Sequence, residues 1–329
     1  MNKAKYRMNI FEIFLKGIQI YLKNFIPLTK VMLFPVLGQI FGIIWIIFTA
    51  FYLSQNIAKS FTPEVLTNNI IFIFFILIVA ILPGFFVFTK AFWEYMIAMV
   101  SLNSMVSNII KQGQLKDAHV HSRLVKVKSK EFIGLLLFLS LIWLFGLMLP
   151  AVVFFIQSPF VGIMFAGLEL IALMILTIIS IYLSISYQVF AFENLSVINI
   201  VKRSWNLVEG NFWRTFFLGF VVVLLTNMLI PSIFQTVADK ISLTTFMVQP
   251  LQPYAVNLSG NPVYLNLISS GIMGQKLLPT AFSYLIIKFI TQAILGGIVT
   301  AFLLPLGSAC YTLLYLDIVD RKSFKSKKK

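Results

Sequence analysis

The chain has 329 residues, of which 59% are hydrophobic and 11% are charged, and its net charge is +15. Soluble domains carry about 25% charged residues, so this composition excludes an ordinary soluble protein and favours an integral membrane protein. The single cysteine, Cys310, excludes an internal disulfide framework and a cysteine-based metal site.

Six stretches are apolar over about the 20 residues that a helix needs to cross a bilayer. In chain order they cover residues 31–53, 70–89, 132–156, 160–187, 215–237 and 280–304. The predicted fold class is therefore all-α, a polytopic membrane protein whose single domain covers residues 1–323. Residues 238–279, which contain several prolines and glycines, are expected to form an irregular external loop, and residues 324–329 a basic cytoplasmic tail. Bends are expected at Pro83 and Pro305.

Basic residues are distributed unevenly among the connections. The N-terminal segment, the connections after the second and fourth spans, and the C-terminal tail carry six, six, three and six lysines or arginines, whereas the opposite side carries only Lys59, Lys240 and Lys276. This asymmetry predicts that both termini are cytoplasmic. It also explains the net charge without a nucleic-acid partner. The expected partners are membrane lipids, including anionic headgroups at the cytoplasmic face.

A related segment precedes each odd-numbered span, and it ends in Lys23-Asn24-Phe25, Lys130-Glu131-Phe132 or Gly210-Asn211-Phe212. Residues 195–209 predict an amphipathic helix in the membrane interface, with Gly210 in the left-handed conformation that ends a helix. Its apolar face is expected to hold Val197, Val201, Trp205 and Val208, and the N-terminal segment to present Ile10, Phe11, Phe14, Leu15, Ile18 and Leu22. The pattern predicts a threefold repeat of interfacial helix and two spans, over residues 8–105, 106–198 and 199–323.

A family resemblance rests on Arg203, Ser204, Trp205, Leu207, Gly210, Phe212, Trp213 and Arg214. These residues resemble the motif of the bacterial membrane domain found in membrane-type glycerophosphoryl diester phosphodiesterases and in stand-alone six-span proteins. The stretches YLKNFIPL (21–28) and LLYLDIVDRK (313–322) also fit, except that Val319 stands where the family usually has arginine. The resemblance covers nearly the whole chain. It implies a domain of the bacterial cell membrane without the catalytic barrel, because such a barrel needs about 250 residues.

Two charged residues, Glu169 and Lys288, lie well inside predicted spans and at similar depth. A charge in hydrocarbon is costly unless it is paired or faces water. The two residues are therefore candidates for a structural ion pair, for a site that handles substrate or protons, or for side chains that reach water.

Three carboxylates, Glu94, Glu193 and Asp317, lie near aromatic residues at the cytoplasmic ends of the even-numbered spans. The first interpretation is structural pairing with nearby cations, such as Lys90 with Glu94 and Arg321 with Asp317. The alternative is that all three converge to hold a divalent ion. The two histidines, His119 and His121, lack a third ligand nearby and predict no metal site.

No nucleotide-binding, nucleophile-elbow or zinc-protease motif is present, and no catalytic residue, metal or cofactor is predicted. The favoured function is a non-catalytic membrane module that supports envelope or lipid metabolism. The alternatives are a transporter or lipid-translocating protein, for which Glu169 and Lys288 would matter, and a membrane enzyme acting on lipid headgroups through the three carboxylates.

Overall fold

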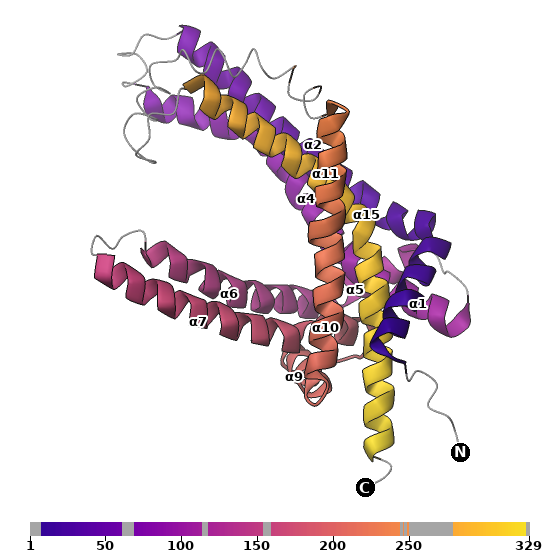
Figure 1. Ribbon diagram of the computed structural model, residues 1–329. Helices are drawn as coiled ribbons and strands as arrows, with labels where there is room; N and C mark the ends of the chain where they lie inside the picture. The colour runs from indigo at the N-terminus through magenta and orange to yellow at the C-terminus, as the bar shows by residue number, and fades with distance from the viewer. Residues whose placement is uncertain are drawn as a thin grey trace. The chain divides into compact units, whose positions relative to one another are not determined.

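The computed structural model describes residues 8–60, 69–113, 118–153, 159–243, 246, 249 and 279–326, and its regular elements are helices (Figure 1). No strand occurs within these ranges, which confirms the all-α class. A π-helix, η1 (Leu224–Leu229), joins α10 to α11. The α-helices are α1 (Ile10–Lys23), α2 (Phe25–Ser60), α4 (Ile70–Gln112), α5 (Ala118–Val127), α6 (Ser129–Val153), α7 (Pro159–Leu183), α8 (Ser186–Phe192), α9 (Val197–Val208), α10 (Phe212–Val223), α11 (Ile230–Lys240) and α15 (Pro279–Ser326).

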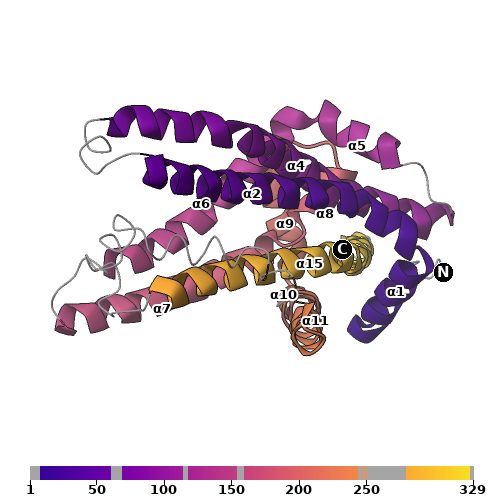
Figure 2. The ribbon, with the colours of Figure 1, turned by 90° about the horizontal axis from the view of Figure 1, so that it is seen from above.

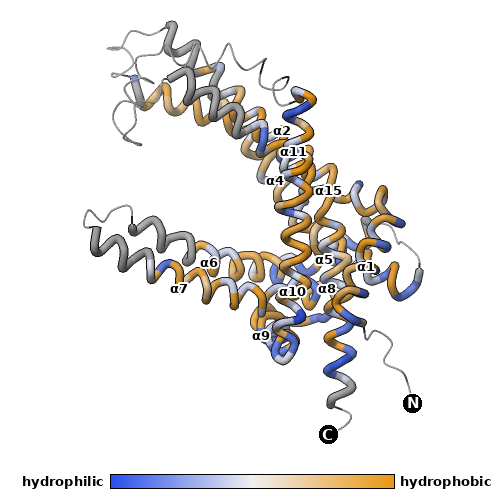
Figure 3. Tube along the Cα trace, viewed as in Figure 1, coloured by the Kyte–Doolittle hydropathy of each residue, from blue (hydrophilic) through white to orange (hydrophobic). Residues whose placement is uncertain are grey.

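Five helical stretches among the described residues are long and apolar enough to cross a membrane. They are Phe25–Thr49, Ile71–Gln112, Gly167–Phe192, Phe212–Lys240 and Ile294–Ser323, which overlap predicted spans one, two, four, five and six. The third predicted span falls on α6, where the side chains from residue 145 onward lie outside the described residues. Apolar residues cover most of the length of these helices (Figure 3). The chain is consistent with a multi-pass membrane protein.

The prolines at the expected bends lie inside helices that continue past them. Pro83 lies within α4, Pro305 within α15, and Pro35 within α2. Proline removes one backbone hydrogen bond, and the turns on either side of it still satisfy their own backbone groups in a long apolar helix. α15 extends to Ser326, so the basic segment expected as a tail from residue 324 begins inside this helix. The predicted external loop at 238–279 starts with the end of α11, and residues 250–278 lie outside the described ranges.

The chain forms two compact units, each of which is described by itself: unit 1 is Met1–Leu28, Ile97–Leu225 and Leu304–Lys329, and unit 2 is Thr29–Met96 and Thr226–Leu303. In unit 1, α6 and α7 form an antiparallel hairpin, and α9 packs against α6, α7 and α8 (Figure 2). The last turns of α4 supply fully buried core residues such as Leu102 and Met105. On α15, Cys310, Leu314 and Ile318 are buried in the same way.

In unit 2, α2 and α4 approach closely at two glycines. A Cβ atom added to Gly38 would lie 2.8 Å from the Cβ of Ala91, and one added to Gly42 would lie 2.7 Å from the backbone nitrogen of Phe88. Their spacing is the Gly-x-x-x-Gly pattern that lets two membrane helices pack with their backbones close together. This hairpin is therefore held by van der Waals contact over a small-residue surface.

Helix α1 presents three different faces in unit 1. Ile13, Gly17 and Tyr21 are buried, and a Cβ atom on Gly17 would lie 2.5 Å from the Sγ of Cys310. The apolar residues of the predicted face divide, because Phe11, Leu15 and Leu22 are exposed while Ile10, Phe14 and Ile18 are half-buried. The polar face holds Glu12, Lys16, Gln19 and Lys23.

An asparagine with the same contact lies in the junction after α1 and in the junction after α9. The side-chain Nδ2 of Asn24 donates to the carbonyl of Ile20 at 2.9 Å, and Nδ2 of Asn211 donates to the carbonyl of Leu207 at 3.3 Å. The backbone angles of the two asparagines are similar, with φ/ψ of −121°/29° and −130°/17°. Seven residues before each asparagine is a buried small residue, Gly17 or Ser204. The two helix–span junctions therefore share side-chain and backbone geometry.

The junction before α6 lies earlier in the chain than predicted. The backbone N–H of Phe132 donates to the carbonyl of Lys128, as that of Leu28 does to Asn24 and that of Thr215 to Asn211. Leu28, Phe132 and Thr215 are all buried. The equivalent of the two asparagines is therefore Lys128, whereas the sequence pattern places it at Glu131. The polar–Phe pattern misleads here because α6 begins at Ser129, before its first buried phenylalanine.

Candidate functional site

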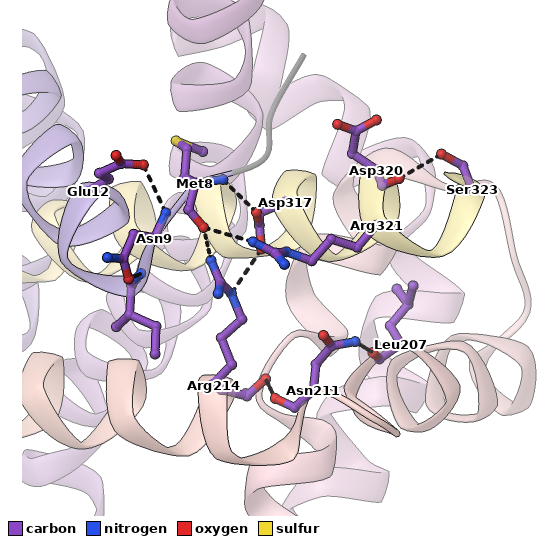
Figure 4. Close-up of polar contacts among 12 residues, drawn as sticks. Met8, Asn9, Glu12, Leu207, Asn211, Arg214, Asp317, Asp320, Arg321 and Ser323 are labelled. Atoms are coloured by element: carbon purple, nitrogen blue, oxygen red, sulfur yellow. Dashed lines mark hydrogen bonds and ion pairs between the residues drawn. The ribbon is translucent and has the colours of Figure 1, made fainter. Parts of the chain in front are cut away.

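Asp317 is the most deeply buried charge of unit 1 and lies on α15 (Figure 4). Its Oδ1 accepts the backbone N–H of Met8 at 2.9 Å. Its Oδ2 lies 2.9 Å from Nε of Arg214 at the start of α10 and 2.9 Å from Nε of Arg321, one turn further along α15. The carboxylate thus joins the beginning, the middle and the end of the chain. We call Met8, Arg214, Asp317 and Arg321 the Asp317 cluster.

Both backbone groups of Met8 take part in this cluster. While its N–H binds Asp317, its carbonyl oxygen accepts hydrogen bonds from Nη2 of Arg214 and Nη2 of Arg321 (Figure 4). Asn9 then caps α1, because its side chain and that of Glu12 form a reciprocal capping box. The segment leading into α1 is therefore held through its backbone, so the identity of the side chain at position 8 carries no part of these bonds.

Glu193, at the end of α8, has a separate set of partners. Nε of Arg203 on α9 lies 3.0 Å and 3.1 Å from its two carboxylate oxygens, and the hydroxyl of Tyr315 donates to Oε1 at 2.8 Å. Hydrogen bonds to an ionised acceptor are stronger than neutral ones, so this set fixes α9 against α8 and α15.

The other motif residues of α9 and α10 also make structural contacts. The Oγ of Ser204 is buried and donates to the carbonyl of Tyr182 at 2.8 Å, and the ring of Trp205 stacks on that of Tyr182 with centroids 4.1 Å apart. Phe212 lies 5.5 Å from the same tyrosine ring and from the ring of Trp213, which is exposed. Gly210 has φ of +78°, which confirms the left-handed helix end predicted for it.

The buried face of α9 holds Ile200, Ser204, Leu207 and Val208, whereas Trp205 is 40% exposed. Of the predicted apolar stripe, Val208 therefore faces the core, and the placement of Trp205 in the membrane interface stays a prediction. The small polar residue Ser204 faces inward because it can donate to a backbone carbonyl of α7.

Two of the three predicted carboxylates have separate partners within unit 1. Glu193 and Asp317 lie in unit 1 with separate cation partners, and Glu94 lies on α4 in unit 2. In the part of the chain that is described, no group of three or more His, Cys, Asp or Glu side chains is arranged to hold a metal ion. The predicted pair of Asp317 and Arg321 is confirmed. The contacts of Arg214 and of Met8 with Asp317 were missed, since about 100 and 300 residues separate them along the chain.

Glu169 lies in α7 and is partly buried, while the side chain of Lys288 lies outside the described residues, so their pairing stays a prediction. His121 is fully buried, with Nδ1 2.8 Å from Oγ of Ser104 and Nε2 3.2 Å from Nδ2 of Asn108. The side chain of His119 lies outside the described residues. The burial of His121 was missed because the basic residues around it predict an exposed segment.

Comparison of the chain with protein-family models, with curated proteins and with solved structures finds no match.

Proposed function

We propose that the chain is a six-span membrane module of the bacterial cytoplasmic membrane, with both termini in the cytoplasm. Five apolar helices support this directly, and α6, over the third predicted span, supplies a sixth. The orientation is supported by the basic residues, which gather in the N-terminal segment, the connections after spans two and four, and the tail.

The module is built as three repeats of an interfacial helix followed by two spans. The matching asparagines in the junctions after α1 and α9 support this, as do the buried residues at equivalent positions of the three junctions, Leu28, Phe132 and Thr215. The exposed apolar residues of α1, Phe11 and Leu22 among them, lie beside its lysines, as in a helix that rests in the headgroup region.

The function is non-catalytic and supports envelope or lipid metabolism, as the resemblance to the phosphodiesterase-associated membrane domain suggests. One observation carries this choice over an enzyme. The motif residues that match the family make intramolecular contacts: Arg203 binds Glu193, Ser204 binds α7, and Arg214 binds Asp317. A carboxylate that pairs with two arginines and accepts hydrogen bonds from Arg321 and a backbone N–H has little capacity left to handle a substrate proton.

The test compares three variants of the full-length protein that each neutralise one carboxylate: Asp317→Asn, Glu193→Gln and Glu209→Gln. Glu209 is exposed at the end of α9 and serves as the control. We expect the first two to lower the melting temperature in detergent and the amount of inserted protein, and to weaken rescue of a gene-deleted strain in the same proportion. The control should behave as the wild type.

The readout in cells is membrane lipid composition and envelope integrity after each variant replaces the gene. Suppose that Asp317→Asn or Glu193→Gln gave wild-type levels of stable, inserted protein while rescue was abolished. The carboxylate would then act in chemistry, and the headgroup enzyme would replace the non-catalytic module.

A further inference from the structure

Three basic residues from different elements gather around the end of α8 in unit 1. Nζ of Lys111, in the last turn of α4, lies 5.7 Å from the ring centroid of Phe192. Nζ of Lys128, between α5 and α6, lies 5.8 Å from the ring centroid of Phe190 and 3.4 Å from the carbonyl oxygen of Glu193. Arg203 approaches the same glutamate from α9.

The carboxylate of Glu193 forms an ion pair with only one of these three cations, Arg203. Both carboxylate oxygens of Glu193 lie against Arg203, and one also accepts the hydroxyl of Tyr315. Within the described ranges, neither Lys111 nor Lys128 has a carboxylate at ion-pair distance. Their ammonium groups lie instead over aromatic faces, where a cation is attracted by the ring but its charge is not neutralised. Two positive charges therefore remain uncompensated.

Each lysine lies beside an aromatic ring that other aromatic residues hold in place. Phe190 is 3% exposed and lies 5.5 Å from the ring of Phe132, and Phe192 lies 5.0 Å from the ring of Tyr315. An oxyanion at the end of α8 would meet the ammonium group of Lys128 beside the carbonyl of Glu193, and that of Lys111 beside the ring of Phe192.

We infer that Lys111 and Lys128 bind the phosphate of an anionic phospholipid at the end of α8. The inference rests on the proposed membrane function, because it requires this end of α8 to lie at the cytoplasmic headgroup level. Phosphate oxygens accept charge-assisted hydrogen bonds from ammonium groups. Bilayers with anionic lipid supply such groups at high local concentration beside basic residues. The lipid therefore supplies a negative charge that the described residues around these two lysines lack.

The experiment measures lipid binding to the full-length protein in detergent by native mass spectrometry, with phosphatidylglycerol and phosphatidylcholine as probes. The test variant is K111Q/K128Q. The control variant is K23Q/K202Q, which removes the same charge from two exposed lysines of α1 and α9. We expect the wild type to prefer phosphatidylglycerol. The test variant should weaken that binding about fivefold for each lysine removed, and the control by less than about twofold.

Two further measurements distinguish loss of the lipid site from loss of folding and from binding of free phosphate. K111R/K128R keeps both charges and should restore the preference, which separates loss of the site from loss of folding. Inorganic phosphate should neither compete at millimolar concentration nor raise the melting temperature, and competition would mean that the ligand is free phosphate. Equal losses in test and control variants, or no lipid preference in the wild type, would overturn the site while leaving a membrane protein. A chain that failed to enter membranes would instead overturn the proposed function.

Discussion

Asp317 has no exposed surface, and a buried carboxylate is unfavourable unless charged groups and hydrogen bonds replace its water. Arg214 and Arg321 supply the charges, and the N–H of Met8 supplies a further donor. Asp317 and the two arginines together carry a net charge of +1. The negatively charged Glu12 lies close enough to attract the guanidinium of Arg214. Removing one partner from a buried ion pair costs about 3–5 kcal/mol because the remaining charge stays buried.

Replacing Arg203 or Arg214 with lysine should change the stability of the protein by different amounts. Arg214 pairs through Nε with the carboxylate of Asp317 and donates through Nη2 to the carbonyl of Met8, so one planar group contacts two acceptors, whereas Arg203 uses Nε alone. A lysine has no fork and cannot reproduce the first arrangement. We expect Arg214→Lys to lower the free energy of unfolding by about 1.5–3 kcal/mol, the value of one charged hydrogen bond, and Arg203→Lys by less. Thermal unfolding of both variants in the same detergent measures the difference, and equal effects would contradict the forked role of Arg214.

At the scale of elements, two close helix contacts each depend on one glycine. The atom that faces the glycine belongs to a side chain in one contact and to the backbone in the other. The atom that faces Gly17 of α1 is the side-chain Sγ of Cys310 on α15, whereas the atom that faces Gly42 of α2 is a backbone nitrogen of α4. A side-chain atom can be removed by mutation and a backbone atom cannot. The two contacts should therefore differ in whether a second mutation relieves them.

Gly17→Ala should destabilise unit 1 by about 1–3 kcal/mol, as overpacking of a core does. Cys310→Ala removes Sγ and should recover most of that loss in the double variant, since the next atoms of Cys310 lie 3.4 Å from the added Cβ, in ordinary contact. The matched pair is Gly42→Ala with Phe88→Ala, where the backbone clash stays and no recovery is expected. Melting temperatures of the four single and two double variants test this, and recovery in both pairs would show that the helices simply move apart.

The elements themselves are largely predictable, because long apolar runs and the glycine at position 210 specify helices and one helix end locally. What escapes prediction depends on contacts between distant segments. Ser204 turns inward because α7 offers it a carbonyl, and His121 is buried because α4 offers Ser104 and Asn108. For the candidate site, the pair of Asp317 with Arg321 is local and was predicted. The roles of Arg214 and of the Met8 backbone leave no local pattern in the sequence.

At the scale of the whole molecule, the proposed orientation is testable because the chain has one cysteine and it is buried. In a Cys310→Ala background, single cysteines replace Lys23, Lys202 and Lys322 on the predicted inner side and Lys240 on the outer side. We expect a membrane-impermeant maleimide added to intact cells to label Lys240→Cys only, and the other three after the membrane is permeabilised. Labelling of Lys322→Cys but not of Lys23→Cys in intact cells would contradict the even number of spans, and labelling of both would contradict the proposed orientation.

The hydrogen bond between Met8 and Asp317 joins residues 309 positions apart. A ribosome makes the first of them long before the second, so α1 leaves the ribosome without the group that will hold its leading segment. Arg214 likewise enters the membrane region before its carboxylate exists. The Asp317 cluster can close only when nearly the entire chain has been synthesised, and a chain that stops before residue 317 lacks the attachment of its first helix as well as its last turns. The cluster thus makes the attachment of the first helix depend on completion of the last one during biogenesis.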